Sequence, residues 1–340
     1  MEIEQLIKRL PKVEQHVHVV GSIRPETLIW LAEKSDLDEP FKTPREARGF
    51  FQYESFPQFI EAYSTVVNCI TEEDQFERIT YEMLESDARC NVQYVEVSFS
   101  APDHVLRGLD YEKMLDAINR GIKRARMDFG IECNVRIDLV RNYGPEKGME
   151  VLDWVESKSD NVISIDLGGS EERFPAKPFK SVYQRAKNMG LHLVAHAGEV
   201  AGAESIWQAV NELAVEHVGH GVTAIGEPKL LEHLRKRSIA IETCPTSNIR
   251  TQVVRTLRSH PIRAFYDLGL MVTVSTDDPS MFETDMNNEY LQLHRELDFS
   301  LSELFNISLN AVNSSFLPEE SKSKMLESFN RTYNRILDEK

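Results

Sequence analysis

His16 and His18 could chelate a divalent metal ion, because residues two apart in a β-strand point to the same face. Two imidazole groups directed at one point form a natural chelate for an ion such as zinc. A lone pair at this spacing is weak evidence, since surface and core histidines produce it as well. Further histidines and carboxylates must join the pair before the sequence predicts a metal site.

Three other segments carry such residues at the ends of predicted strands. They are His196 and Glu199 in HAGE, His220 in GHG, and Asp277 and Asp278 in STDDP. Buried histidine and aspartate are costly unless they are paired or bind a metal. The sequence therefore predicts a metal-dependent hydrolase with one divalent ion, held by His16, His18, His196 and Asp277.

Eight short apolar or β-branched runs alternate with helical patterns along the chain. The predicted strands are residues 13–19, 92–98, 132–140, 162–167, 191–196, 217–220, 239–244 and 272–276. Eight such units with parallel pairing make an α/β fold of the (β/α)₈ TIM-barrel type, whose catalytic rim lies at the carboxyl ends of the strands. A doubly wound sheet is the alternative, but no Gly-rich phosphate turn follows the first strand.

The connection between the first two strands, residues 24–89, is unusually long. It carries helical patterns and an aromatic stretch that includes Phe56 and Phe59. Core packing would explain these aromatic residues. Loops after barrel strands surround the active site, however, so the segment is also interpreted as a partial lid with Phe56 and Phe59 near a substrate. No linker-like or repeated segment divides the chain, and residues 1–340 are expected to form a single domain.

The composition disfavours several classes of partner. With a formal net charge of −16 over 340 residues, the surface repels phosphate backbones and anionic lipids, so neither nucleic-acid nor membrane partners are expected. The four widely spaced cysteines suit reduced thiols. No signal-peptide pattern or membrane-length apolar run occurs, which makes the cytoplasm the expected compartment. Nothing in the sequence indicates the oligomeric state.

The motifs taken together resemble the adenosine deaminase family. The matching segments are HVHVVGS at 16–22, YVEVSFS at 94–100, IDLGG at 165–169, HAGE at 196–199, GHG at 219–221, CPTSN at 244–248 and STDDP at 275–279. They occur in the family's order and span the whole barrel. The resemblance implies hydrolytic deamination of a purine nucleoside that carries a 6-amino group, with a divalent ion, Zn²⁺ first, activating the water that attacks C6.

The resemblance also implies roles for residues beside the metal. Glu199 would protonate N1 as a general acid and then carry protons to the departing ammonia. His220 would orient and stabilise the attacking hydroxide, and Asp278 would hydrogen-bond the attacking group or N7. The backbone N–H of Gly169 would contact N3.

Val20 leaves the choice of substrate open. Adenosine-specific members of the family usually carry an Asp here that binds the 5′-hydroxyl, and adenine-specific members usually carry Glu. Valine would favour an apolar 5′ group. The candidates are aminodeoxyfutalosine (an intermediate of menaquinone biosynthesis), 5′-deoxyadenosine, methylthioadenosine and adenosine itself, with adenine less favoured. The family pattern also differs at Ser98-Phe99, where an Arg-Tyr pair is common, and at Ser170, where Asp is usual.

Several alternatives stay open at this point. Asp166 could bridge two metals, although the absence of a lysine at 165–169 favours one. A receptor-binding relative of the same fold, or a mononuclear amidohydrolase acting on another amidine or a cyclic amide, are the competing functions. Five further histidines are interpreted as structural: His104, His192, His217, His233 and His260.

Overall fold

The computed structural model describes residues 2–35, 37, 41–53 and 55–339. Its strands are β1 (Lys12–His18), β2 (Val92–Phe99), β3 (Glu132–Val140), β4 (Val162–Gly168), β5 (His192–Ala197), β6 (His217–His220), β7 (Ala240–Thr243) and β8 (Val272–Val274). They pair in parallel in the order of the sequence, from β1 to β8. The predicted (β/α)₈ barrel is therefore confirmed.

Asp277, in the segment after β8, connects the last strand of the barrel to the first strand. Asp277 forms a parallel bridge with Val17: its amide donates to the His16 carbonyl at 2.9 Å, and its carbonyl accepts from the His18 amide at 2.8 Å. The β1 ladder is irregular between Glu14 and Val17, next to this bridge. Such irregularities re-aim side chains near barrel rims, and here they lie beside the two histidines.

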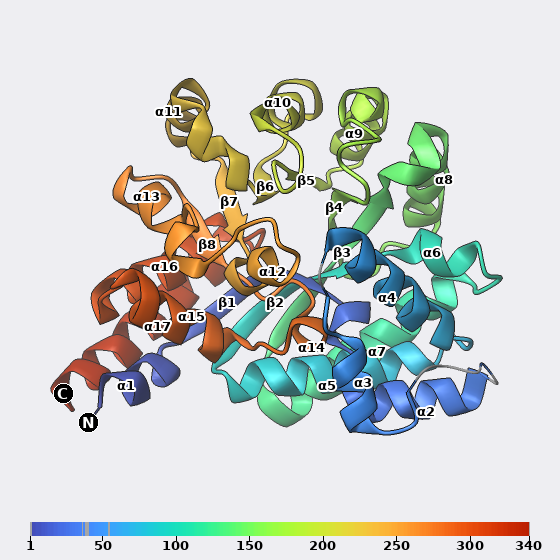
Figure 1. Cartoon of the computed structure of the whole chain (residues 1–340), viewed down its shortest axis with the longest axis horizontal. Coiled ribbons are helices and arrows are strands. Elements are labelled where there is room, and N and C mark those ends of the chain that lie inside the picture. Colours follow the sequence, from blue (N-terminus) through green and yellow to red (C-terminus); the bar gives the residue numbers. More distant parts are fainter. Residues whose placement is uncertain (1, 36, 38–40, 54, 340) are drawn as a thin grey trace.

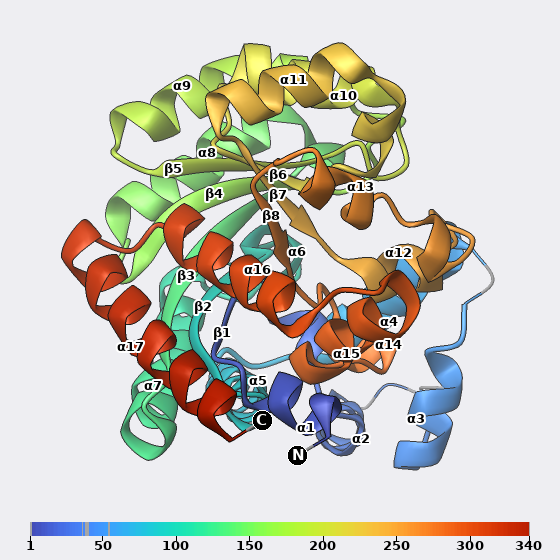
Figure 2. The ribbon, with the colours of Figure 1, turned by 90° about the vertical axis from the view of Figure 1, so that its left-hand side faces the viewer.

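Helices connect the strands and cover the outside of the barrel (Figure 1). After β2 to β7 these are α6 (Ala101–Val105), α7 (Tyr111–Phe129), α8 (Gly144–Ser157), α9 (Lys180–Asn188), α10 (Ala203–Gln208) with a π-helical extension (Ala209–Leu213), α11 (Pro228–Arg237), α12 (Pro245–Arg250) and α13 (Ile262–Asp267). After β8 come α14 (Pro279–Phe282), α15 (Met286–Leu297), α16 (Leu301–Ser314) and α17 (Glu319–Asp338). Figure 2 shows α16 crossing the strands, where it packs on β1 and β8. The short first helix, α1 (Ile3–Arg9), packs against α15 and α16.

The long first connection is helical, as predicted. It holds α2 (Pro25–Ser35), α3 (Pro44–Phe50), α4 (Phe56–Cys69) and α5 (Gln75–Arg89). The helix starts follow from the local sequence: the Thr43 and Ser55 side chains cap α3 and α4, and proline occupies the first turn of each. Because α4 packs on the 3₁₀ turn directly beyond β1, this segment borders the barrel rim.

None of the helices in the described ranges combines the length and apolarity that a membrane crossing requires.

Candidate metal and catalytic site

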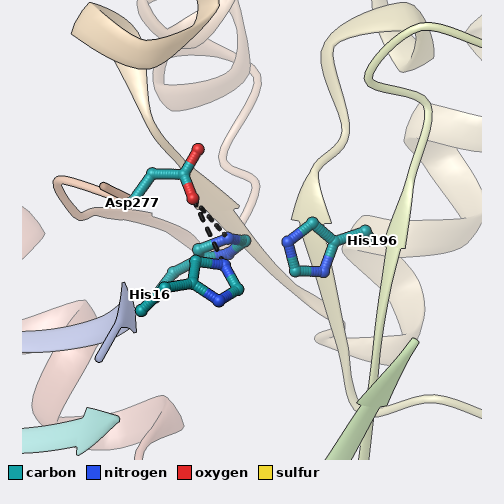
Figure 3. A group of neighbouring side chains, drawn as sticks. His16, His196 and Asp277 are labelled. Carbon is teal, nitrogen blue, oxygen red and sulfur yellow. Dashed lines mark ion pairs between the residues drawn. The ribbon is translucent and has the colours of Figure 1, made fainter. Parts of the chain in front are cut away.

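The four side chains predicted as metal ligands converge at the carboxyl ends of β1, β5 and β8. One donor atom of each lies within 4.8 Å of the others: His16, His18, His196 and Asp277. Asp277 Oδ1 is 3.6 Å from His16 Nε2 and 3.3 Å from His18 Nε2. In Figure 3, Asp277 points at His16, and His196 faces them from the opposite side. Residues up to 261 positions apart in the sequence are thus gathered into one cluster, and their role as ligands stays a prediction.

Each histidine of the cluster presents its other ring nitrogen to a buried carboxylate. The Nδ1–oxygen distances are 3.2 Å for His16 and Glu242, 3.2 Å for His18 and Asp138, and 3.0 Å for His196 and Asp166. A carboxylate accepts the proton of the neighbouring N–H, so hydrogen sits on Nδ1 and the Nε2 lone pair is left for an ion. His16 Nε2 is buried without a hydrogen-bond partner. Three such imidazoles and one carboxylate fit a divalent ion, and zinc in particular.

The fully buried Arg136 holds two of these carboxylates together. Its guanidinium donates to both oxygens of Glu242 at 2.8 Å and lies 3.3 Å from Asp166. It also reaches Glu96 at 3.4 Å. A buried carboxylate needs such a partner, because an uncompensated charge in the barrel interior is expensive.

Asp166 belongs to this outer layer. Its Oδ1 accepts from the backbone amide of His196 at 3.1 Å and lies beside the His196 ring, and it is absent from the ligand cluster. The bridging role considered from the sequence is therefore not supported. Sequence reasoning also missed Arg136, Asp138 and Glu242. The available signal was a charged residue inside an otherwise apolar strand.

Asp277 and His220 adopt left-handed backbone conformations, with φ of 67° and 61°. Such strain in residues other than glycine is common at functional sites, where surrounding contacts hold it. For Asp277 the contacts are the backbone bonds to β1 and the Ser247 hydroxyl, which donates to Oδ2 at 2.7 Å. Oδ1 is thereby left facing the histidines.

Glu199 lies beside the metal cluster and is 9% exposed. Burial, together with the nearby Asp277 and Glu171 carboxylates, raises the pKa of Glu199 well above its usual value. The raised pKa favours the protonated form of the carboxyl group, which is the form that a general acid needs. His220 Nε2 lies 3.8 Å from Glu199 Oε2 and 3.9 Å from Asp277 Oδ2. Burial lowers the pKa of His220 well below its usual value, so its ring is neutral.

The loop that carries Glu199 is held by a second acidic residue, the buried Glu171. The Glu171 carboxylate accepts hydrogen bonds from four consecutive backbone amides, those of residues 198–201. Arg141, also buried, donates to the carbonyl of His196 at 2.7 Å at the start of the same loop. Neither Glu171 nor Arg141 was identified from the sequence, since their partners are backbone groups that no motif reveals.

Two glycines of the motifs have a physical explanation. A Cβ on Gly21 would lie 1.8 Å from Asp278 Oδ1, so only glycine lets Asp278 pack against the turn beyond β1. Gly169 has a φ of 97°, and a Cβ there would meet Asn142 Oδ1 at 2.5 Å. Both places lie at the barrel rim, at the ends of β1 and β4.

Val20 lies in that turn beyond β1 and is 2% exposed. The turn packs against α4 and α14. The centroid of the Phe59 ring in α4 lies 5.0 Å from the ring centroid of Phe282 in α14 and 5.9 Å from that of Phe56. The predicted aromatic lining and Val20 are thus on neighbouring elements, and contact with a substrate stays a prediction.

Among the histidines interpreted as structural, His217 and His192 are held by contacts outside the ligand cluster. His217 Nδ1 lies 2.7 Å from Glu242, and its Nε2 lies 2.9 Å from the Ser314 carbonyl. His217 lies near Glu96 and Glu242 in a group that could bind a metal, but both carboxylates already pair with the Arg136 guanidinium. His192 stacks on Phe316 at 4.1 Å. His260 differs, because it hydrogen-bonds to Asn248, which in turn hydrogen-bonds to His220.

Comparison with known proteins gives a consistent result. A family model described as adenosine deaminase matches residues 11–332. The chain is 36% identical over 327 residues to the aminodeoxyfutalosine deaminase of Streptomyces avermitilis, covering 95% of this chain and 91% of the relative. It is 30% identical to the adenine deaminase of Acinetobacter baylyi, covering 97% of this chain and 100% of the relative. It is 32% identical to the adenosine deaminase of Shewanella loihica, covering 93% of this chain and 97% of the relative.

Solved structures show the same similarity. The adenine deaminase of Arthrobacter aurescens superposes with a TM-score of 0.91 at 28% identity, covering 95% of this chain and 98% of the other. An amidohydrolase from Burkholderia ambifaria with bound zinc superposes with a TM-score of 0.92 at 25% identity, covering 99% of this chain and 95% of the other.

Proposed function

Because the chain belongs to the adenosine deaminase family, we propose that it hydrolyses the 6-amino group of a purine nucleoside with the residues gathered at the barrel rim. The family and the relatives show that the chain is a metal-dependent hydrolase that deaminates an adenine-type substrate. The roles of its residues and the substrate are proposals.

The observation that carries the proposal is the buried Glu199 carboxyl group, whose pKa is raised, next to a cluster of four side chains that could hold a metal ion. Protonation of N1 by Glu199 draws electrons from the purine ring and makes C6 electrophilic. The carboxylate left by this transfer takes up the hydroxyl proton of the oxygen added at C6 and passes it to the 6-amino group, which leaves as ammonia. The buried position raises the pKa of the group, which favours its protonated form, and strengthens its interaction with developing charge.

The metal would be held by His16, His18, His196 and Asp277, whose donor set favours zinc. A bound divalent ion lowers the pKa of water and supplies a nucleophile at neutral pH. His220 hydrogen-bonds the attacking oxygen, Asp278 binds N7, and the Gly169 amide binds N3. These contacts hold the purine plane between β4, β5 and β8.

Ammonia release from adenine-type substrates by the zinc-loaded enzyme tests the proposal. The substitution Glu199→Gln removes the proton donor, and we expect it to lower kcat by about 10²- to 10⁴-fold while the zinc content stays at wild type. The exposed Glu204 offers a matched control, and Glu204→Gln is expected to leave kcat unchanged. Wild-type activity in Glu199→Gln would overturn the assignment.

We further propose that the 5′ substituent of the substrate is larger or less polar than a free hydroxyl, with aminodeoxyfutalosine as the first candidate. Val20 offers no polar group to a 5′-hydroxyl, and the elements around it contribute Phe59 and Phe282. The relatives named aminodeoxyfutalosine deaminase share 36% identity with this chain, against 30% to 33% for the adenine and adenosine deaminases of similar coverage named for Acinetobacter, Vibrio and Shewanella.

A panel of substrates decides this point. The loss of adenine absorbance is followed for aminodeoxyfutalosine, methylthioadenosine, 5′-deoxyadenosine, adenosine and adenine. We expect kcat/KM to be highest for a 5′-modified nucleoside. If adenosine or adenine is much better than every 5′-modified nucleoside, the proposal for the 5′ group fails while deamination itself stands.

A further inference from the structure

A chain of hydrogen bonds runs from the start of α13 to His220. The Ile262 amide donates to His260 Nδ1 at 3.2 Å. His260 Nε2 lies 3.1 Å from Asn248 Oδ1, and Asn248 Nδ2 lies 3.1 Å from His220 Nδ1. These three side chains are at most 3% exposed, so water does not compete for the bonds. His260 lies just before α13, Asn248 lies in α12, and His220 ends β6.

The direction of every bond in this chain is fixed by its first donor. A backbone N–H can only donate, so His260 Nδ1 accepts and the proton of the neutral ring is on Nε2. That proton is donated to Asn248 Oδ1, which turns the Asn248 NH₂ group toward His220. An NH₂ group can only donate, so His220 Nδ1 accepts as well. The proton of His220 is therefore on Nε2, the nitrogen that faces Glu199 and Asp277.

The scheme applies to neutral imidazole rings. Burial lowers the pKa of His260 to about 3. A neutral imidazole has one donor and one acceptor nitrogen, so its tautomer decides what it offers to the site.

We propose that His260 and Asn248 are positioning residues that hold His220 as an Nε2–H donor toward the reacting atoms. The inference rests on the proposed function in one respect, the presence of the attacking oxygen opposite His220. A donor at this position directs the lone pair of that oxygen toward C6. It also excludes the neutral His220 as the base that removes the proton, because its Nε2 carries no free lone pair.

The contrast with the metal-ligating histidines supports this inference. In His16, His18 and His196 the Nδ1 atom faces a carboxylate, which places hydrogen on Nδ1 and leaves Nε2 for an ion. In His220 the Nδ1 atom faces an amide donor, which produces the opposite tautomer. The group that faces Nδ1 thus determines whether Nε2 carries a hydrogen, as in His220, or a free lone pair for a metal ion, as in the other three histidines. The two kinds of histidine lie close together, because the centroids of the His220 and His16 rings are only 4.9 Å apart.

The substitution Asn248→Asp tests the relay with almost no change of shape. The new carboxylate can only accept, so it still binds His260 but requires a proton on His220 Nδ1. We expect kcat to fall by roughly 10²- to 10⁴-fold, the range that a positioned proton donor contributes. KM, the melting temperature and the zinc content are expected to change little.

The first link of the relay is tested at His260. His260→Gln keeps an N–H donor for Asn248 and is expected to retain more activity than His260→Leu, which lets the Asn248 amide turn over. The control is His233→Gln, because His233 packs against Trp207 on the outer helices, outside the relay. It is expected to match the wild type.

The tautomer itself is measured by nitrogen NMR of the zinc-loaded enzyme, with His220 assigned through His220→Gln. We expect an Nε2-protonated His220 in the wild type and loss of that signal in Asn248→Asp. An Nδ1-protonated His220 in the wild type, or wild-type kcat in Asn248→Asp, overturns the proposal. The NMR arm needs no substrate, so it decides the tautomer even if the chain fails to deaminate purine nucleosides or a variant folds poorly.

Discussion

Glu171 Oε2 lies 3.1 Å from the backbone nitrogen of Glu199, the residue proposed to protonate the purine. The same carboxylate holds the amides of residues 198, 200 and 201. The backbone of the proposed general acid is therefore supported by a carboxyl group on a different loop, the one after β4. This support acts on the backbone, so the Glu199 side chain keeps its freedom to exchange protons.

Replacement of Glu171 by Gln should reduce activity without removing the metal. The amide NH₂ group would face backbone N–H donors, so the loop would lose part of its support. We expect kcat to fall about 10- to 100-fold, as small displacements of a catalytic group do. Amide hydrogen exchange in residues 197–202 should rise in parallel. Glu172→Gln, at the exposed neighbouring position, is the control. Unchanged exchange and kcat in Glu171→Gln would contradict the prediction.

The pH profile should follow the raised pKa of Glu199. An ordinary glutamate titrates near 4.3, and a catalyst that needs its protonated form would lose activity above that pH. Because burial raises the pKa of Glu199, the protonated form persists to higher pH. We therefore expect kcat/KM of the zinc-loaded enzyme to be retained through neutral pH and to decline only on the alkaline side. A decline that begins near pH 5 would show that Glu199 is not the acid.

Arg136 should be essential for stability. Removal of its guanidinium by Arg136→Met leaves Glu242, Asp166 and Glu96 without the cation that they share in the barrel interior. We expect the free energy of unfolding to fall by about 3–5 kcal/mol, measured by denaturant titration. The exposed Arg120, whose partners are Asp74 and, at 2.8 Å, Glu77, provides the comparison. Arg120→Met is expected to cost about 0–1 kcal/mol, and equal losses for both variants would refute the argument.

Asp138 should tune the metal affinity through His18. Its Oδ2 lies 3.2 Å from His18 Nδ1 and accepts from the Ser100 hydroxyl at 2.8 Å. Asp138→Asn keeps the shape and removes the charge, so zinc affinity is expected to fall by about 10- to 100-fold. Competition with a chelator measures the change. Asp160→Asn, at an exposed position, should leave the affinity as it is. An unaltered affinity in Asp138→Asn would mean that the carboxylate does not orient the ring.

The sequence predicts the four-residue cluster better than it predicts the side chains that support the cluster, and the reason is geometric. His16, His18, His196 and Asp277 follow from the rule that the carboxyl ends of parallel strands meet at one rim. Glu242 and Asp138 act across the inside of the barrel, where partners depend on strand rotation and register. The His260–Asn248 contact depends on the path of the chain between α12 and α13, which no periodic pattern specifies. Helix existence is predictable from the chain, whereas such pairings require coordinates.

Val20→Asp should move substrate preference toward a free 5′-hydroxyl. The aspartate would accept a hydrogen bond from that hydroxyl, while a buried carboxylate facing an apolar 5′ group would stay unpaired, at a cost of about 1–3 kcal/mol. We expect the ratio of kcat/KM for adenosine to that for methylthioadenosine to rise by about 5- to 150-fold, the factor to which that energy corresponds. The control Val20→Thr changes polarity with little change of shape and should shift the ratio less. If the ratio is the same in wild type and Val20→Asp, the 5′ group does not contact position 20.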